Sequence, residues 1–126
     1  MKNLLKEFTP EFLEENRYKI SVENVLESSD ALLLDVRSCD EVECMSIEEG
    51  LVYYPELRYM HIPMNELPDR LEELLPFSKI FIFCRTTSRS AIVYAFLRLQ
   101  GLKHVRLVEG GYVKLLKTLV KKHGLF

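Results

Sequence analysis

The chain has 126 residues and a mass of 14.8 kDa, which suits one domain that buries its own core. Hydrophobic residues make up 48% and the net charge is -2 at pH 7, so no overall basic field attracts nucleic acid or an acidic membrane. No apolar run is long enough to cross a membrane, and the first residues lack the apolar stretch of a secretory signal. We therefore expect a cytoplasmic protein with neither nucleic acid nor a membrane as partner.

In chain order, the first half of the sequence predicts a helix at 9–16, a brief strand at 18–20, a helix at 21–28 and a strand at 31–36. Thr9 is expected as the N-cap of the first helix, with Pro10 at its first helical position. Ser21 is expected to cap the next helix. The continuous apolar run from Ala31 to Val36 is typical of a central parallel strand that is covered on both faces.

The second half predicts a helix at 41–49, a strand at 58–62, a helix at 68–75, a strand at 79–83, a helix at 88–100, a strand at 105–108 and a helix at 112–122. Apolar residues cover most of the circumference of helix 88–100, so we expect it to be largely buried. This alternation predicts an α/β domain of three layers, with a mainly parallel central sheet flanked by helices. Residues 1–17 are interpreted as an N-terminal helical extension and residues 18–126 as the domain.

Three cysteines, Cys39, Cys44 and Cys84, cannot all pair within one molecule, so reduced thiols are predicted. No Cys-x-x-Cys occurs and no histidine stands at metal-ligand spacing from a cysteine, so neither a metal site nor a cofactor is expected. Cys44 could act as a resolving thiol for Cys84, but a buried structural cysteine is the favoured interpretation.

Cys84 is the chemically distinctive thiol because it ends a predicted strand and begins a six-residue loop that leads into a helix. Such a loop directs backbone N–H groups inward, and the helix N-terminus adds partial positive charge. Arg85 and Arg89 add two permanent cations. Each of these effects favours a thiolate, which suits nucleophilic attack on a sulfur donor or an oxyanion. The loop by itself is equally consistent with a packed structural thiol.

Segments elsewhere in the chain decide between these two interpretations. Residues 21–24 are similar to a helix start of the form Ser-x-x-Glu, and the segment from Leu33 to Arg37 is followed by Glu41. Further along, Cys84 is followed by Arg89-Ser90, and a closing section extends from Leu97 to Tyr112. In this order and spacing they resemble the rhodanese family, from about residue 18 to residue 116. The resemblance implies a rhodanese-like domain.

The resemblance also implies a sulfurtransferase activity. Cys84 would take a sulfane sulfur from a small anionic donor such as thiosulfate and pass the persulfide sulfur to a thiophilic acceptor, a thiol or a protein. The residues expected to bind the donor are Arg85, Thr86, Thr87, Ser88 and Arg89. Asp35 and Arg37 are expected to support the end of the strand. The Cys-x4-Arg spacing is that of sulfurtransferases, whereas related phosphatases have Cys-x5-Arg, so phosphatase activity is disfavoured.

Two departures from the family pattern support an alternative, a non-catalytic rhodanese-like interaction module. Thr87 stands where thiosulfate-using members usually have glycine, and it would be strained if the loop requires a positive φ there. The usual Gly-His-Ile-Pro-Gly-Ala segment is also missing, and residues 47–58 stand in its place. We expect the enzyme rather than the module.

Overall fold

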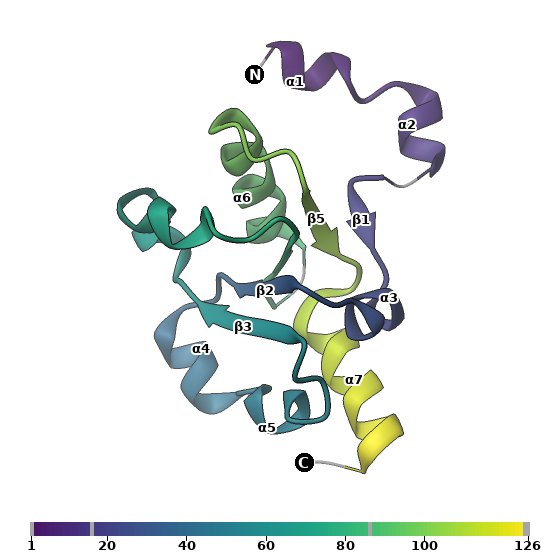
Figure 1. Ribbon diagram of the computed structural model, residues 1–126, viewed down its shortest axis with the longest axis vertical. Coiled ribbons are helices and arrows are strands. Elements are labelled where there is room, and N and C mark those ends of the chain that lie inside the picture. The colour runs from purple at the N-terminus through teal and green to yellow at the C-terminus, as the bar shows by residue number, and fades with distance from the viewer. Residues whose placement is uncertain (1, 16, 86, 125–126) are drawn as a thin grey trace.

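The computed structural model describes residues 2–15, 17–85 and 87–124, and it contains a five-stranded sheet with helices on both faces (Figure 1). All neighbouring strands are parallel, in the order β1-β5-β4-β2-β3. This confirms the predicted three-layer α/β architecture. The strands are β1 Lys19–Ile20, β2 Ala31–Asp35, β3 Leu57–His61, β4 Ile80–Phe83 and β5 Val105–Val108.

Alternate side chains of the central strands enter two separate cores. Leu33 of β2 packs with α3 (Val22–Glu27), α5 (Glu48–Leu51) and α7 (Gly111–His123) on one face. Leu34 packs with α6 (Ser88–Leu99) and the 3-10 helix η1 (Met64–Leu74) on the other. Every residue of β2 and β4 is buried, as predicted for strands covered on both sides. The helices are α1 Lys2–Lys6, α2 Pro10–Glu15, α3 Val22–Glu27, α4 Cys39–Cys44, α5 Glu48–Leu51, the 3-10 helix η1 Met64–Leu74, α6 Ser88–Leu99 and α7 Gly111–His123. Within the described residues no helix has the length and apolar character needed to cross a bilayer.

Two predicted helix starts are confirmed by their caps. The Ser21 side chain accepts a hydrogen bond of 3.2 Å from the Asn24 N–H, and Thr9 accepts one of 3.2 Å from the Phe12 N–H. These short polar side chains satisfy backbone donors that have no partner inside the helix. The helix boundaries were therefore predictable from local chemistry.

Two predicted helices take a different form. The expected helix 41–49 is divided into α4 and α5, because Ser38 already caps a helix at Cys39 that ends at Cys44. The expected helix 68–75 is part of the longer η1, which is interrupted at Arg70, where φ is -123°. Pro68 inside η1 lacks the N–H that a regular α-helix would use.

The prediction that α6 is largely buried is wrong for one side of the helix. Val93, Tyr94 and Leu97 are buried, whereas Ile92 is 58% exposed and Leu99 is 48% exposed. The apolar composition of α6 is nearly uniform, so the sequence could not show which side lies away from the sheet. The buried side of this helix is the one that meets β4 and β5, and α1 also packs against the helix.

Residues 47–58 form α5 and the turns that lead into β3. Gly50 lies so close to α7 that an added Cβ would be 2.8 Å from Leu119 Cδ1. The Tyr53 ring stacks on His123 with centroids 4.1 Å apart, and Tyr54 Oη is 2.7 Å from His123 Nε2. This segment therefore packs on the end of α7, and it precedes β3 rather than lying at the strand ends near Cys84.

The N-terminal segment contains α1, which the sequence analysis did not predict, as well as α2. Leu4 is buried, and the ring centroids of Phe8 and Tyr94 are 6.3 Å apart. Glu7 forms an ion pair of 2.7 Å with Arg98 of α6. Figure 1 shows this segment beside α6 and β1. The domain boundary at residue 17 remains a prediction.

The exposure of α6 predicts effects of very different size for two substitutions on one helix. Leu97→Ala should lower the free energy of unfolding by about 2–5 kcal/mol, because it removes a fully buried side chain and leaves a cavity. Ile92→Ala, the matched control, should change it by less than about 0.5 kcal/mol. Urea unfolding of both variants measures the difference in their free energies of unfolding. Equal losses of stability would contradict the exposure of Ile92 on α6.

Candidate active site

Cys84 lies immediately after β4, where the sheet presents the carboxyl ends of its parallel strands. Its carbonyl oxygen accepts a hydrogen bond of 2.8 Å from the Tyr112 N–H at the start of α7, and the preceding Phe83 carbonyl accepts one of 3.0 Å from Val36. These bonds tie the backbone around the cysteine to the end of β2 and to the start of α7. Ligands of open α/β sheets bind at this edge.

The Cys84 side chain is fully buried and points toward the first turn of α6. Its Sγ donates a 3.6 Å hydrogen bond to Ser90 Oγ, and Ser90 Oγ donates one of 3.1 Å to the Thr87 carbonyl. Ser90, which the sequence analysis used only as a family match, is therefore part of the sulfur's environment. The N-terminus of α6 contributes partial positive charge at the same place.

The loop brings the predicted donor-binding residues to this edge with different exposures. Arg85, Thr87 and Ser88 are exposed, and Arg89 is half-buried. Thr86, also predicted to bind the donor, lies outside the described residues. A cavity of about 410 Å³ adjoins the loop at Thr87 and extends between α6 and β5. The donor-binding roles of these residues remain predictions.

The backbone conformation of Thr87 differs from the strained one that was expected from the missing glycine. Its φ is -123° and its ψ is -7°, a conformation open to any residue, so no positive-φ strain is stored there. Thr87 is the N-cap residue of α6 but its side chain makes no capping hydrogen bond. In the described part of the chain, the only non-glycine residue with positive φ is Asp30.

Asp35 and Arg37 form a fully buried ion pair beside the cysteine. Arg37 Nε donates to Asp35 Oδ1 at 2.9 Å, and Arg37 Nη2 donates to Asp35 Oδ2 at 2.8 Å. Arg37 Nη1 donates to the Met45 carbonyl at 2.7 Å, so each guanidinium nitrogen is engaged. Burial by itself would lower the pKa of Arg37, but hydrogen bonding and charge pairing with Asp35 raise it above its usual value.

Two tyrosines complete this cluster, and the sequence analysis assigned no such role to them. Tyr59 Oη donates a 2.6 Å hydrogen bond to Asp35 Oδ2, and the pKa of Tyr59 is raised by burial and by this carboxylate. The Arg37 guanidinium lies 4.4 Å from the Tyr112 ring centroid. Such cation–π contact compensates part of the cost of burying the charge. No spacing rule in the sequence connects Tyr59 or Tyr112 to Asp35.

A second ion pair joins the start of α6 to α4. Arg89 Nη2 donates to Glu41 Oε2 at 2.8 Å, and Nη1 donates to Oε1. Glu41 Oε1 also accepts a hydrogen bond from the Ser38 N–H, so one carboxylate closes the α4 capping box and holds Arg89. Hydrogen bonding to Arg89 lowers the pKa of Glu41 to about 2. The Ser38-x-x-Glu41 spacing could have revealed the cap, but not the partner on α6.

The remaining two thiols do not share the environment of Cys84. Cys39 and Cys44 are both exposed on α4, so the expectation of a buried Cys44 is wrong. Within α4, which alternates cysteine and valine with acidic residues, no side chain is buried. Over the described ranges, no three His, Cys, Asp or Glu side chains gather as they would around a metal ion.

The chain is similar in sequence and in fold to proteins of one known family. A family model described as Rhodanese-like domain matches residues 20–118. A putative sulfurtransferase of Bacillus subtilis is 34% identical over 89 residues, 71% of this chain and 77% of that protein. A sulfurtransferase of Allochromatium vinosum is 28% identical over 91 residues, 72% of this chain and 77% of that protein. The crystal structure of a rhodanese-related protein from Thermoplasma volcanium is similar with a TM-score of 0.65 and 27% identity, covering 79% of this chain and 91% of the other.

The low pKa of Glu41 predicts a pH-dependent contribution to stability. Its usual pKa is 4.5 and its folded-state pKa is about 2, so the contribution is complete above about 4.5 and is lost as the pH falls toward 2. The Glu41→Gln variant should therefore lose less stability than wild type over this pH range. Chemical unfolding between pH 5 and 2.5 measures the free energy of unfolding of both proteins, with Glu43→Gln on the same helix as the control. Equal pH dependence in wild type and Glu41→Gln would contradict the assignment.

Proposed function

The chain belongs to the rhodanese-like domain family, and we propose that it is a sulfurtransferase in which Cys84 carries a sulfane sulfur as a persulfide. The observation that carries the proposal is the place of Cys84, between the carboxyl end of β4 and the N-terminus of α6. The similarity to proteins named as sulfurtransferases supports the same reaction type.

The transfer consists of two displacements at sulfur. In the first, the Cys84 thiolate attacks the outer sulfur of thiosulfate, the sulfur–sulfur bond breaks, and sulfite leaves with the electron pair. In the second, a nucleophilic acceptor attacks the terminal sulfur of the persulfide, and the Cys84 thiolate leaves. The thiol proton is released to solvent before the first step, and no external oxidant or reductant is needed. The α6 N-terminus and the loop N–H groups would stabilise the anionic sulfur.

The two arginines of the loop would have different tasks. Both terminal nitrogens of Arg89 are held by Glu41, and a Coulombic interaction with Cys84 contributes to the raised pKa of Arg89. We infer that Arg89 supplies a fixed positive field near the sulfur. Arg85 is exposed, and no ion pair holds it within the described residues, so it is available to meet an incoming anionic donor.

Burial of Cys84 supports a small donor. The sulfur has no exposed surface, so a donor must enter through the loop, and a compact anion such as thiosulfate requires the least opening. The cavity beside Thr87 offers an approach for the larger acceptor. The acceptor would then attack the terminal sulfur of the persulfide, which extends beyond the buried Sγ.

A non-catalytic interaction module is the second candidate. It is favoured by Val52 and Tyr53, which are 71% and 52% exposed on the segment that replaces the usual family motif. Backbone strain at Thr87 does not support the interaction module, because φ of Thr87 is negative. Persulfide formation at Cys84 distinguishes the two candidates.

The first test of the proposal combines turnover with intact mass. Wild type should convert thiosulfate and cyanide to thiocyanate, and protein treated with thiosulfate should gain one sulfur atom. Cys84→Ser should lose both, because it lacks the nucleophile. Cys39→Ser and Cys44→Ser, which change exposed thiols, should keep both. Absence of both signals from wild type, with several sulfur donors tried, would leave the interaction module as the better candidate.

The second test concerns Thr87. Thr87→Gly should leave thiosulfate turnover equal to or below that of wild type, since its backbone already has a φ that every residue adopts and glycine adds only flexibility. Turnover per enzyme measures this, with Ser88→Gly as a control for added flexibility at the neighbouring position. A several-fold increase limited to Thr87→Gly would show that the loop needs another backbone conformation during transfer.

A further inference from the structure

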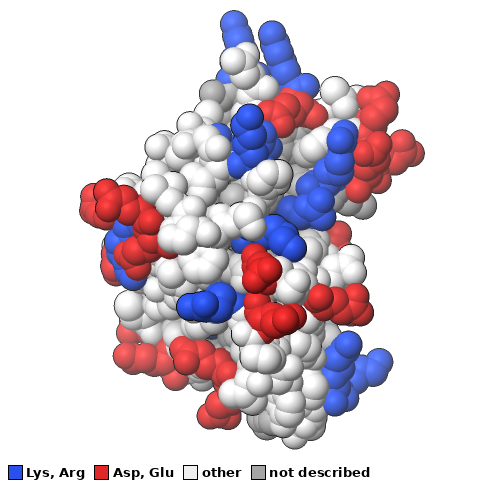
Figure 2. All heavy atoms as spheres, viewed as in Figure 1, with Lys and Arg blue, Asp and Glu red and all other residues white. Residues whose placement is uncertain are grey.

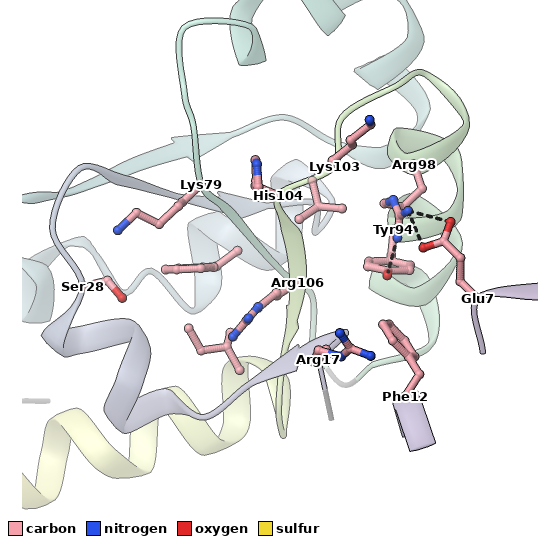
Figure 3. A pocket seen from close by; sticks show the side chains of 13 residues that line it. Glu7, Phe12, Arg17, Ser28, Lys79, Tyr94, Arg98, Lys103, His104 and Arg106 are labelled. Carbon is pink, nitrogen blue, oxygen red and sulfur yellow. Dashed lines mark hydrogen bonds and ion pairs between the residues drawn. The ribbon is translucent and has the colours of Figure 1, made fainter. Parts of the chain in front are cut away.

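A cavity of about 450 Å³ lies at the end of the sheet opposite to Cys84, around the open edge of β5 (Figure 3). Its walls come from residues before β4 and β5, from α6, and from the N-terminal segment. We call it the β5-edge pocket and define it by Glu7, Arg17, Lys79, Arg98, Lys103 and Arg106. Its volume is within the range of small-molecule sites, about 300–1,000 Å³.

The open edge arises from the shortness of β1. In the described sheet, β1 pairs only with Leu107 and Val108, so the first half of β5 pairs with β4 on one side and has no strand on the other. The N–H groups of Leu107 and Glu109 donate toward β1, and because alternate residues of a parallel strand face the same neighbour, the Val105 N–H faces this open side. An edge strand offers such groups to a ligand.

The pocket is strongly basic within an acidic protein. Five cationic side chains and one carboxylate line it, and His104 lies among them, although the whole chain has a net charge of -2. Figure 2 shows several Lys and Arg side chains over the region of β5 and β1, with Asp and Glu side chains beside them. Figure 3 shows Arg106 in the middle of the pocket, between Lys79 and Arg17.

Most of this positive charge is not neutralised by the protein. The single carboxylate, Glu7, is held by Arg98 with hydrogen bonds of 2.7 and 2.9 Å. In the described part of the chain, Lys79, Lys103 and Arg106 form no ion pair. Arg98 Nε is buried beside them without a hydrogen-bond partner among those residues. Three unpaired cations around one cavity create a field that attracts a multiply charged anion.

The other walls of the pocket are apolar and aromatic. Phe81 and Val105 form buried apolar surface, while the rings of Phe12 and Tyr94 come from α2 and α6. Flat rings pack well against such surfaces, and the surrounding cations can meet a charged group attached to the ring. A simple inorganic anion would leave this apolar part uncovered.

We propose that the β5-edge pocket binds a small phosphorylated ligand that carries a flat ring, of the chemical type of a nucleoside diphosphate. Lys79, Lys103 and Arg106 contact the phosphates, and the ring lies against the Phe12 and Tyr94 side. The site is independent of the sulfur chemistry, because Cys84 lies at the other end of β4.

The proposal is tested by calorimetric titration of the full chain with ADP at low ionic strength. ADP should bind saturably, and the paired variant Lys79→Gln/Arg106→Gln should bind about tenfold more weakly or worse, since two charged contacts are lost. The Lys114→Gln/Lys117→Gln pair, which removes the same charge from exposed positions of α7, should bind like wild type. The Cys84→Ser variant should also bind like wild type.

Separate titrations with pyrophosphate and with adenosine test whether the phosphates and the ring each contribute to binding. Both should bind more weakly than ADP, and the pyrophosphate affinity should fall with added salt. The proposal is overturned if ADP does not bind, or if the Lys79→Gln/Arg106→Gln pair and the α7 control pair bind ADP equally. Pyrophosphate binding as tight as that of ADP would overturn the assignment of the ring. The thermal midpoint of each variant without ligand verifies that it is folded.

Discussion

Burial of Arg37 is the constraint on which the rest of this end of the sheet depends. A guanidinium without solvent exposure is costly unless each of its donors has an acceptor, and removing one partner of such a pair typically costs about 3–5 kcal/mol. Here the acceptors come from Asp35 at the end of β2 and from the Met45 carbonyl after α4, and the Tyr112 ring covers the charge. The ion pair therefore fixes the relative positions of β2, α4 and α7. The same α7 start holds the Cys84 carbonyl.

The Glu41–Arg89 pair extends this frame to the other side of the cysteine loop. Glu41 belongs to α4, whose position already depends on Arg37, and Arg89 belongs to the first turn of α6. The loop is thus anchored at Arg89 by a charge pair with α4 and at Cys84 by the backbone hydrogen bond from Tyr112 of α7. A short loop between two fixed ends has few conformations, which is the condition for preorganised N–H groups around an anion.

The sequence was sufficient for the features that depend on neighbouring residues. The continuous apolar run of β2, the Ser21 cap and the strand before Cys84 each carry a local signal, and each was found. The predictions failed where a distant contact decides the outcome. Ile92 is exposed because the contacts of α6 with β4, β5 and α1 leave its side of the helix uncovered within the described residues, and Thr87 adopts an ordinary φ that its residue type alone could not reveal.

The site shows the same division. Cys84 and its loop were recognised from a local pattern and a family resemblance, whereas the Tyr59–Asp35 contact and the Glu41–Arg89 pair join residues that are 24 and 48 positions apart. The β5-edge pocket is a stronger case, because its cations come from the segments before β1, β4 and β5, from α6 and from β5 itself. Single-sequence patterns contain no signal for such groups.

The short strand β1 has a consequence for the order in which the chain folds as it is synthesised. Among the described residues, β1 pairs with β5 alone, and β5 is the last strand to leave the ribosome. The segment of α1, α2 and β1 is therefore synthesised before its partners: α1 packs on α6, and β1 cannot pair until residue 108 has emerged. The strands β2, β3 and β4, which pair with one another, can assemble earlier. The N-terminal segment then closes the structure, and this late docking also forms the walls of the pocket that it shares with β5.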